Sequence, residues 1–189
     1  MNCIIETQRL CLRLWEEKDR ETFRVMNSDP QVMEYFPKTL TVNESDEFLD
    51  GVIDRISKKG YGFWAMEVKD GGQFAGYIGF NDATFPSYLT PCVEIAWRLT
   101  KNMWGKGYAT EGAKACLKHG FEVIGFKEIY SFTSTLNKRS EKVMVKIGMK
   151  KMGEFNHPQV ELESPLRKHV LYRVTREDYL TSSTSRDQR

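Results

Sequence analysis

The sequence predicts one α/β domain, and three observations support this prediction. Segments with the alternation of strands and segments with the spacing of helices follow one another along most of the chain. The chain has 189 residues, 40% of them hydrophobic, which suits one well-buried core and is short for two domains. Residues 92–111 have the pattern of a strand, a glycine-containing loop and a helix start. We expect the domain to span residues 1–180 and a disordered polar tail to span 181–189.

The composition argues against several classes of protein. The net charge of +2 and the isoelectric point of 8.3 indicate no dominant polyelectrolyte partner, so we expect no nucleic-acid binding. There is no apolar run of membrane-spanning length and no signal-peptide core, and we expect a cytoplasmic protein without a membrane partner. The cysteines show no close pair and no metal-ligand spacing, so we expect reduced thiols and no metal site. They are Cys3, Cys11, Cys92 and Cys116.

The first forty residues are predicted to form a strand and two helices. Apolar and charged residues alternate towards the end of segment 3–14, which predicts an antiparallel strand. The spacing of apolar residues predicts a helix within residues 16–28. Asp29 and Pro30 together are typical of a helix start, so we expect a short helix up to Tyr35.

A longer helix and a hairpin are predicted next. Thr41 and Glu44 have the spacing of a capping box, which predicts a helix up to about residue 59. Two strand-like segments within 61–80 surround an Asp-Gly-Gly turn signal and predict a hairpin. We expect a loop over residues 81–91, either above the substrate or as an ordinary connection.

Strands and helices alternate in the second half of the chain. Apolar residues recur there at helical steps in two segments and at strand-like density in four. We expect strands at 92–99, 127–134, 149–155 and 169–175, a helix beginning near Ala109, and a second helix that Asn137 caps and Gly148 ends.

The loop before the first of these helices contains Gly105, Lys106 and Gly107. A helix N-terminus presents unpaired N–H groups and the positive end of the helix dipole, which suit a phosphate. The loop lacks the Walker A pattern, and Thr110 stands where a dinucleotide fingerprint needs its third glycine. A phosphate site and a plain glycine-rich turn that caps a helix are equally open from the spacing. Glu111 is expected to favour the dipole or to anchor the loop.

The same loop resembles a known acetyl-CoA loop. Residues 102–109, Asn-Met-Trp-Gly-Lys-Gly-Tyr-Ala, resemble the Q/R-x-x-G-x-G/A loop of GNAT N-acetyltransferases, with Asn102 where Gln or Arg is usual. Residues 104–111 resemble the W-G-x-G-[YLF]-A-T-E segment of the RimJ/RimL-type branch, and the opening E-T-Q-R-L is similar to the branch's first strand. The resemblance covers about residues 6–179. It implies a GNAT fold, an α/β (α+β) domain with a mixed, mostly antiparallel central sheet and helices on both faces.

The resemblance implies acetyl-CoA as the cosubstrate. Main-chain groups of the strand at 92–99 would contact the acyl carbonyl and the pantetheine, the amides of the glycine loop would hold the pyrophosphate, and the later N-x-x-S segment would meet the pantetheine arm. The residues implied at the cofactor are Trp97, Leu99, Asn102, Gly105, Lys106, Gly107, Tyr108, Ala109, Thr110, Asn137 and Ser140. The 3′-phosphate would meet Lys106, Lys138 or Arg139, unless these are solvated surface charges.

Two residues are the candidates for proton transfer. Glu94 lies on an apolar strand, where desolvation raises a carboxyl pKa, and we favour it as the general base. The alternative is an ion pair between Glu94 and Arg98. Met144 stands where many members of the resembled family have a tyrosine, so the proton donor would be Ser140, a water or no group at all. Ser140 and Asn137 also fit a plain helix cap with one small buried residue.

The three histidines have weaker claims to proton transfer. His157, in an expected loop, is the second candidate for the base. His119 and His169 follow it.

The predicted function is N-acetyl transfer. The protein would move an acetyl group from acetyl-CoA to a primary amine of a protein N-terminus, a polyamine or a small molecule, by direct attack in a ternary complex. The alternative is a non-catalytic acyl-CoA-binding or regulatory module, and an NTPase is disfavoured by the missing Walker residues. A homodimer is compatible with the sequence.

Overall fold

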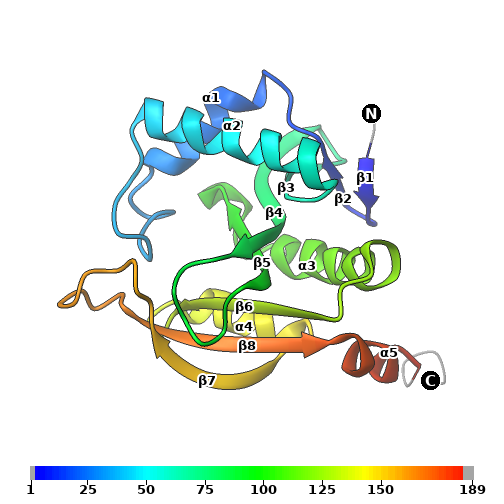
Figure 1. Cartoon of the computed structure of the whole chain (residues 1–189). Helices are drawn as coiled ribbons and strands as arrows, with labels where there is room; N and C mark the ends of the chain where they lie inside the picture. The colour runs from blue at the N-terminus through cyan, green and yellow to red at the C-terminus, as the bar shows by residue number, and fades with distance from the viewer. Residues whose placement is uncertain (1–2, 185–189) are drawn as a thin grey trace. The chain divides into compact units, whose positions relative to one another are not determined.

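The computed structural model describes residues 3–184, and Figure 1 labels its helices and strands. The chain forms two compact units. The first contains the residues up to Asn81 and Ile95–Cys116, and the second contains Asp82–Glu94 and the residues from Leu117 onward. Strand β5 (Cys92–Leu99) and helix α3 (Tyr108–His119) each have residues in both units. The expectation of one domain over residues 1–180 stays a prediction.

The sheet of the first unit has the strand order β1-β2-β3-β4-β5. Neighbouring strands from β1 to β4 pair antiparallel. Gly76 allows β4 to approach β5 closely, because a Cβ there would lie 2.1 Å from the Arg98 carbonyl oxygen. The first four strands are β1 (Cys3–Glu6), β2 (Leu10–Arg13), β3 (Phe63–Val68) and β4 (Gln73–Ala83).

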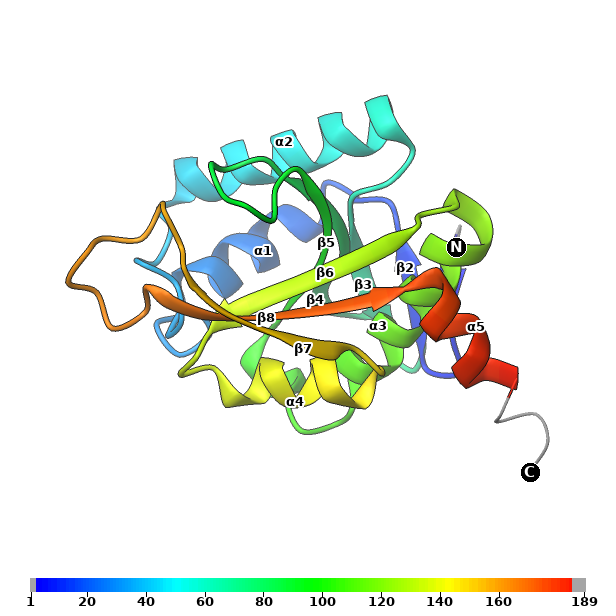
Figure 2. The same cartoon turned by 60° about the horizontal axis from the view of Figure 1, so that its bottom comes forward.

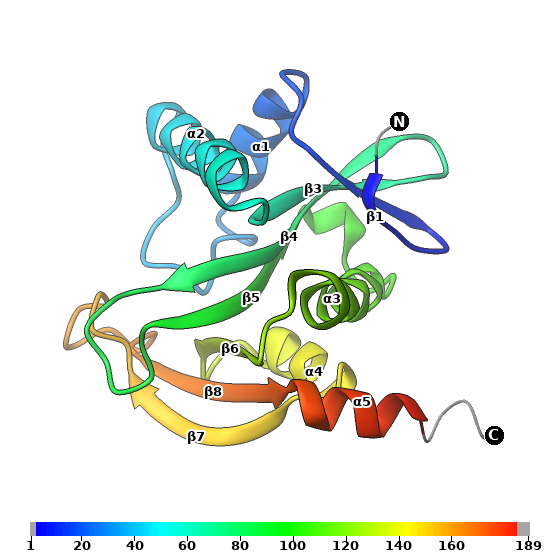
Figure 3. The ribbon, with the colours of Figure 1, turned by 45° about the vertical axis from the view of Figure 1, so that its right-hand side comes forward.

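Helices cover both faces of these strands. Successive side chains of a strand point to opposite faces, so neighbouring residues of β4 contact different helices. Tyr77 of β4 packs into a buried cluster with Phe23 and Leu49, which lie on α1 (Asp19–Ser28) and α2 (Val42–Lys59). The next residue, Ile78, lies against α3, where a Cβ added at Gly112 would be 3.3 Å from the Ile78 Cδ1 atom. Figure 3 shows α1 and α2 side by side, with α3 across β3 and β4 from them.

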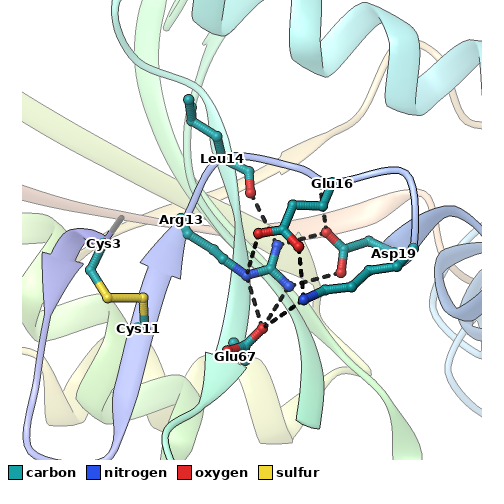
Figure 4. Close-up of polar contacts among 8 residues, drawn as sticks. Cys3, Cys11, Arg13, Leu14, Glu16, Asp19 and Glu67 are labelled. Atoms are coloured by element: carbon teal, nitrogen blue, oxygen red, sulfur yellow. Dashed lines mark hydrogen bonds and ion pairs between the residues drawn. A yellow bond between two sulfur atoms is a disulfide. The ribbon is translucent and has the colours of Figure 1, made fainter. Parts of the chain in front are cut away.

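A buried ion cluster fixes β2 to β3 and to the start of α1 (Figure 4). Arg13 donates to both carboxylate oxygens of Asp19, at 2.7 and 2.8 Å, and to Oε2 of Glu67, at 2.9 and 2.7 Å. All three side chains are at most 2% exposed. Removing one partner would leave a buried charge uncompensated, which would destabilise the unit.

Two expectations for the N-terminal segment are wrong. Residues 3–14 form two antiparallel strands, and the pairing of β1 with β2 brings Cys3 and Cys11 into a disulfide with a Cα–Cα distance of 5.3 Å. These two cysteines were expected to be reduced, since their closeness depends on a strand pairing that the cysteine spacing does not reveal. Residues 30–35 form turns instead of a short helix.

The α2 prediction is confirmed in detail. The Thr41 side chain accepts from the Glu44 amide and the Glu44 side chain accepts from the Thr41 amide, which completes the capping box. Gly60 follows the helix in the left-handed conformation, with φ of 75°, as expected for a residue that ends a helix.

The second unit contains an antiparallel set in the order β6-β8-β7, and β5 pairs parallel with β6 at Glu94 and Tyr130. Helix α4 runs along one face of this set (Figure 2), and Tyr172 of β8 donates to Glu141 of α4 at 3.1 Å. These elements confirm a mixed, mostly antiparallel sheet. Their bounds are β6 (Glu128–Ser134), α4 (Lys138–Lys146), β7 (Lys150–Asn156), β8 (Lys168–Thr175) and α5 (Arg176–Thr184).

The expected polar tail overlaps a helix. Residues 181–184 belong to α5. At the start of this helix, the hydroxyl of Thr175 accepts a hydrogen bond from the Asp178 amide at 3.1 Å and so caps it. Residues 185–189 lie outside the described range. Within residues 3–184, no helix has the length and apolar character needed to cross a membrane. The same residues contain no group of three or more His, Cys, Asp or Glu placed to hold a metal ion.

Candidate active site

The glycine loop is exposed and ends at the N-terminus of α3. Gly105, Lys106 and Gly107 are all exposed, and the two glycines have φ of 75° and 82°, which L-residues with a side chain rarely adopt. The Glu111 amide donates to the Gly107 carbonyl at 3.0 Å, which begins the helical ladder. The amides before Glu111 therefore have no acceptor in the helix and point past its N-terminus.

Glu111 fixes this loop to the first strands of the chain. Its Oε1 atom accepts from the Thr7 hydroxyl at 2.6 Å and from the Arg9 amide at 2.9 Å. Its Oε2 atom accepts from Nε of Arg9 at 2.6 Å. Burial opposes ionisation, but these hydrogen bonds hold the pKa of Glu111 below its ordinary value. The carboxylate is therefore an anchor, which agrees with one of the two roles expected for it.

Arg9 connects that anchor to the loop itself. Its Nη1 atom donates to the Lys106 carbonyl at 2.9 Å, and its Cζ atom lies 4.7 Å from the centre of the Tyr108 ring. A Cβ added at Gly107 would lie 3.4 Å from Nη2 of Arg9. The guanidinium thus contacts the loop at three successive residues and fixes its main chain.

This loop fits a pyrophosphate. Exposed glycines let phosphate oxygens approach the backbone, and the helix dipole favours their charge. The contact would be made by the amides of Gly105, Lys106, Gly107, Tyr108, Ala109 and Thr110, which stays a prediction. Asn102 is exposed, and its side chain accepts from the Thr100 hydroxyl at 2.7 Å, so this residue fixes the start of the loop.

Strand β5 leads into the loop. Trp97 is half-buried and Leu99 is buried. The Leu99 carbonyl accepts from Nε1 of Trp104 at 3.0 Å, so the loop tryptophan is also held against the strand. The expected contacts of Trp97 and Leu99 with acyl and pantetheine groups stay predictions.

Arg98 was the possible ion-pair partner of Glu94. It is 8% exposed and donates from Nη1 to Oδ1 of Asn27 at 2.6 Å. Its Cζ atom lies 4.0 Å from the centre of the Phe36 ring. Burial lowers the pKa of this guanidinium. Arg98 is therefore a buried cation held by an amide and by ring faces.

The second unit carries the other predicted site residues on α4 and β5. Asn137 caps α4 by accepting from the Ser140 amide at 3.1 Å, and its amide group donates to the Ser140 hydroxyl at 3.2 Å. Both residues are half-buried, whereas Met144 is buried. The cap that we gave as the plain alternative is present, and the roles of Asn137 and Ser140 towards the cofactor stay predictions. Lys138 is paired with Glu141 at 2.8 Å.

Glu94 lies on β5 beside Tyr130 of β6 and is half-buried. Burial, followed by the charges of Glu94, Glu128 and Asp82, raises the pKa of Cys92 to about 11. These three carboxylates disfavour the thiolate form of Cys92, and Glu128 is also paired with Arg173 at 3.3 Å. A primary amine entering here would arrive as its ammonium form, and the role of Glu94 as the base that accepts its proton stays a prediction.

The three histidines differ in their environments. Burial, with a smaller contribution from the charge of His169, lowers the pKa of His157 to about 4. A base with so low a pKa is a weak proton acceptor at neutral pH, so this pKa argues against His157 as the catalytic base. Burial also lowers the pKa of His169 and of His119.

The chain belongs to the GNAT acetyltransferases. Residues 9–150 match the acetyltransferase (GNAT) domain family. Members of this family transfer acetyl groups from acetyl-CoA, so the chain is an acetyl-CoA-dependent N-acetyltransferase. The binding of the cosubstrate at the glycine loop stays a prediction. The likeness to the RimJ/RimL-type branch is looser.

Named relatives span most of the chain. YkkB of Bacillus subtilis is 32% identical over 158 residues, which cover 80% of this chain and 90% of YkkB. The FsC-acetyl coenzyme A-N(2)-transacetylase of Aspergillus fumigatus is 28% identical and covers 93% of this chain and 77% of the relative. A GNAT-family acetyltransferase structure from Bacillus anthracis superposes with a TM-score of 0.76 at 27% identity, covering 92% of this chain and 98% of that structure.

The sequence analysis missed Thr7 and Arg9 as residues that hold the glycine loop. Both contact Glu111 over more than a hundred positions of sequence. Their segment was noted only as a first strand, although its likeness to the RimJ/RimL-type opening was the available signal.

Proposed function

We propose that this protein acetylates a primary amine by direct attack on acetyl-CoA in a ternary complex. The observation that carries the proposal is the exposed Gly105–Gly107 loop at the N-terminus of α3, which hydrogen bonds of Arg9 and Glu111 hold in place. It supports binding of a pyrophosphate-bearing cosubstrate. Acetyl-CoA supplies the acetyl thioester, and the residues of the chain bind it and move the protons.

The residues of the second unit supply the proton transfers in this proposal. Glu94 accepts the proton of the acceptor ammonium, which leaves the neutral amine as the nucleophile. The nitrogen–carbon bond forms as the carbon–sulfur bond breaks, and the sulfur takes a proton from the Ser140 hydroxyl or from water. The proton that the nitrogen loses as it becomes an amide restores that hydroxyl or water, so the step balances. The half-buried hydroxyl of Ser140 already accepts a hydrogen bond from Asn137, so its own hydrogen remains available to donate.

The acceptor is a primary amine of a small molecule, a polyamine or a protein N-terminus. The carboxylates of Asp82, Glu94 and Glu128 in the second unit favour any acceptor that arrives as an ammonium ion. The name of the Aspergillus fumigatus relative assigns N-acetyl transfer from acetyl-CoA to that protein, which is chemistry of the same kind.

The test is a release assay for free CoA with acetyl-CoA and a panel of amines. The panel holds one polyamine, one alanine-initiated peptide and several small primary amines, and the wild type is compared with Glu94→Gln and Ser140→Ala. We expect turnover with at least one amine. Glu94→Gln is expected to lower kcat/KM about 100-fold or more at neutral pH, as for loss of a general base. Ser140→Ala is expected to lower kcat with little change in KM.

A matched control is Glu163→Gln, which removes an exposed carboxylate from the loop between β7 and β8. It should behave as the wild type. If acetyl-CoA binds and no amine of the panel is acetylated, the protein is a binding module and the proposal fails. If Glu94→Gln keeps full activity, the proton acceptor is another group.

A further inference from the structure

Five aromatic rings gather on one side of the second unit, outside the residues assigned to the reaction. They come from the segment between β4 and β5, from β6, from β7 and the residue after its end, and from β8. We call this group the aromatic cluster, and it consists of Phe85, Phe132, Phe155, His157 and His169.

The rings of the cluster contact one another in several geometries. Phe85 lies edge-on to Phe132, with centroids 5.6 Å apart, and 4.4 Å from His157. The His157 and His169 centroids are 5.0 Å apart. Phe155 is buried, whereas the other four rings are half-buried. The cluster is therefore partly open to solvent.

The two imidazoles have complementary hydrogen-bonding edges. Nδ1 of His169 lies 3.0 Å from the Arg167 carbonyl, and a carbonyl can only accept, so Nδ1 carries the hydrogen and Nε2 is an acceptor. Nδ1 of His157 accepts from the Gln159 amide at 3.3 Å. Nε2 of His157 therefore carries the hydrogen and is a donor.

Neither Nε2 atom has a hydrogen-bond partner among the described residues, and both rings are neutral at neutral pH. Within residues 3–184 the buried side-chain nitrogen and oxygen atoms without a hydrogen-bond partner are Oε1 of Glu67 and Nε of Arg98. Neither imidazole Nε2 is among them. Burial lowers the pKa of both histidines, so the cluster offers one donor, one acceptor and no charge of its own.

The cluster shares a sheet face with Glu94. Glu94 is opposite Tyr130, and Phe132 is two residues further along β6 on the same face. His169 is opposite Ser134 on β6 and opposite Phe155 on β7, which places both rings on that face as well. From strand rise and strand spacing, the Cα atoms of Glu94 and Phe132 are about 8 Å apart. One small molecule can therefore reach both.

We propose that the aromatic cluster binds the non-reacting end of the acceptor, and that this end is a flat, uncharged ring with a polar edge. The acceptor is then a primary amine joined by a short aliphatic chain to a phenol or heteroaromatic ring. Ring faces stack on such a group, and the paired donor and acceptor of His157 and His169 read its edge. This inference rests on the proposed function and names the class of its acceptor.

A polyamine fits this cluster less well. Ring faces attract cations, but a second ammonium has no lone pair to accept from Nε2 of His157. Glu94 lies on this face opposite Tyr130, and in our proposal its carboxylate is next to the reacting amine. The charge and the rings thus match an acceptor with one cationic end and one neutral aromatic end.

The first test compares amines with the same two-carbon chain. The probes are 2-phenylethylamine, tyramine and 2-cyclohexylethylamine, with spermidine and an alanine-initiated peptide as the other acceptor classes. We expect kcat/KM for 2-phenylethylamine to exceed that for the cyclohexyl analogue about fivefold, in line with measured aromatic pairs. Tyramine should exceed 2-phenylethylamine about threefold, as expected for one added hydrogen bond.

The second test removes parts of the cluster one at a time. Phe85→Leu keeps an apolar side chain but loses the ring, and it should abolish the preference for 2-phenylethylamine over the cyclohexyl analogue. His157→Phe keeps a ring but loses the donor, and it should abolish the preference for tyramine alone. Tyr88→Leu removes an exposed ring of the same segment, outside the cluster, and should keep both preferences. The KM for acetyl-CoA should stay unchanged in all three.

Equal use of the aromatic and cyclohexyl amines, or highest kcat/KM for spermidine or the peptide, overturns the inference. So does a preference that survives Phe85→Leu. If no amine is acetylated while acetyl-CoA binds, the proposed function fails, and the cluster is then tested by a thermal-shift titration with tyramine in saturating CoA. A stabilisation that Phe85→Leu removes and the cyclohexyl amine does not produce supports the cluster as a ring-binding site, and its absence overturns it.

Discussion

The glycine loop and the aromatic cluster differ in the interactions that hold them. The loop is fixed by charge: the Glu111 carboxylate and the Arg9 guanidinium join it to the turn between β1 and β2 at distances of 2.6–2.9 Å. The cluster is fixed by ring contacts, and its two histidines are kept neutral by burial. A charged ligand needs charged or hydrogen-bonding partners, whereas an uncharged ring is bound by apolar surroundings.

In our proposal, the two substrates bind to these two different regions. A pyrophosphate is bound by main-chain amides that must stay in place, and directional charge-assisted hydrogen bonds supply that rigidity. A neutral ring is bound by contact area, and a partly open group of rings supplies it. Changes in the loop should therefore act on CoA, and changes in the cluster should act on the acceptor.

The largest effect is expected from Gly107→Trp. The substitution puts a large side chain at φ of +82° and beside Arg9, where it blocks the approach of a phosphate to the backbone. We expect CoA binding to weaken at least about 100-fold by calorimetry, a size typical of losing a cluster of charge-assisted hydrogen bonds. Gly125→Trp, at φ of +86° with open space around it, carries similar strain and should bind CoA normally. Wild-type affinity in Gly107→Trp contradicts the placement of the cosubstrate.

A smaller effect is expected from Glu111→Gln. The amide keeps the shape of the side chain but loses the charge that pairs with Arg9, so the loop becomes less rigid. CoA affinity should fall about tenfold, the equivalent of roughly 1.4 kcal/mol. Glu122→Gln is the control, because Glu122 is an exposed carboxylate that accepts from the Tyr179 hydroxyl in the second unit. Equal CoA affinity in the two variants would show that the anchor has no role in binding.

The aromatic cluster predicts a dependence of stability on pH. The folded-state pKa of His157 is lowered from 6.5 to about 4, so between these values the unfolded chain binds a proton that the folded chain does not. The free energy of unfolding should therefore rise as pH increases from 4 to 6.5. We expect a contribution of order 1 kcal/mol, since solvent reaches part of the ring.

The control for this pH dependence is His157→Phe. Urea unfolding of both proteins at pH 4.5 and pH 7 isolates the contribution, because the other titrating groups are shared. The wild type should lose more stability on acidification than the variant. An identical pH dependence would mean that the cluster does not suppress protonation of His157.

The smallest effect is expected from Lys106→Ala. The side chain is exposed and its carbonyl, which stays in the variant, accepts from Arg9. We therefore expect CoA affinity to change less than about threefold, as is usual for an exposed charge. A loss of tenfold or more would assign the Lys106 ammonium a direct phosphate contact.

Local signals in the sequence predicted most of the elements and the loop. The capping box of Thr41 and Glu44 and the glycine loop each lie within a few residues, so their patterns are visible in the sequence. The start signal at Asp29 and Pro30 misled, because so short a segment does not offset the cost of helix nucleation. One helical bond forms, from the Met33 amide to the Asp29 carbonyl, and the segment continues as turns.

Features that join distant segments were not predictable. The disulfide of Cys3 and Cys11 depends on the pairing of two short strands. The bond between Arg9 and Glu111 spans about a hundred residues. The aromatic cluster unites Phe85 with His169, and no spacing rule connects them. These features were not found because they follow from tertiary structure, whereas the candidate residues of the site lie in continuous motifs.

The separation of the two regions is tested most directly by one set of four proteins: wild type, Glu111→Gln, Phe85→Leu and the double variant. The measurements are the Kd for CoA and the KM for 2-phenylethylamine. We expect Glu111→Gln to raise only the Kd for CoA, Phe85→Leu to raise only the acceptor KM, and the free-energy changes to add in the double variant. A Phe85→Leu protein that binds CoA as weakly as Glu111→Gln would contradict the separate roles of the two regions.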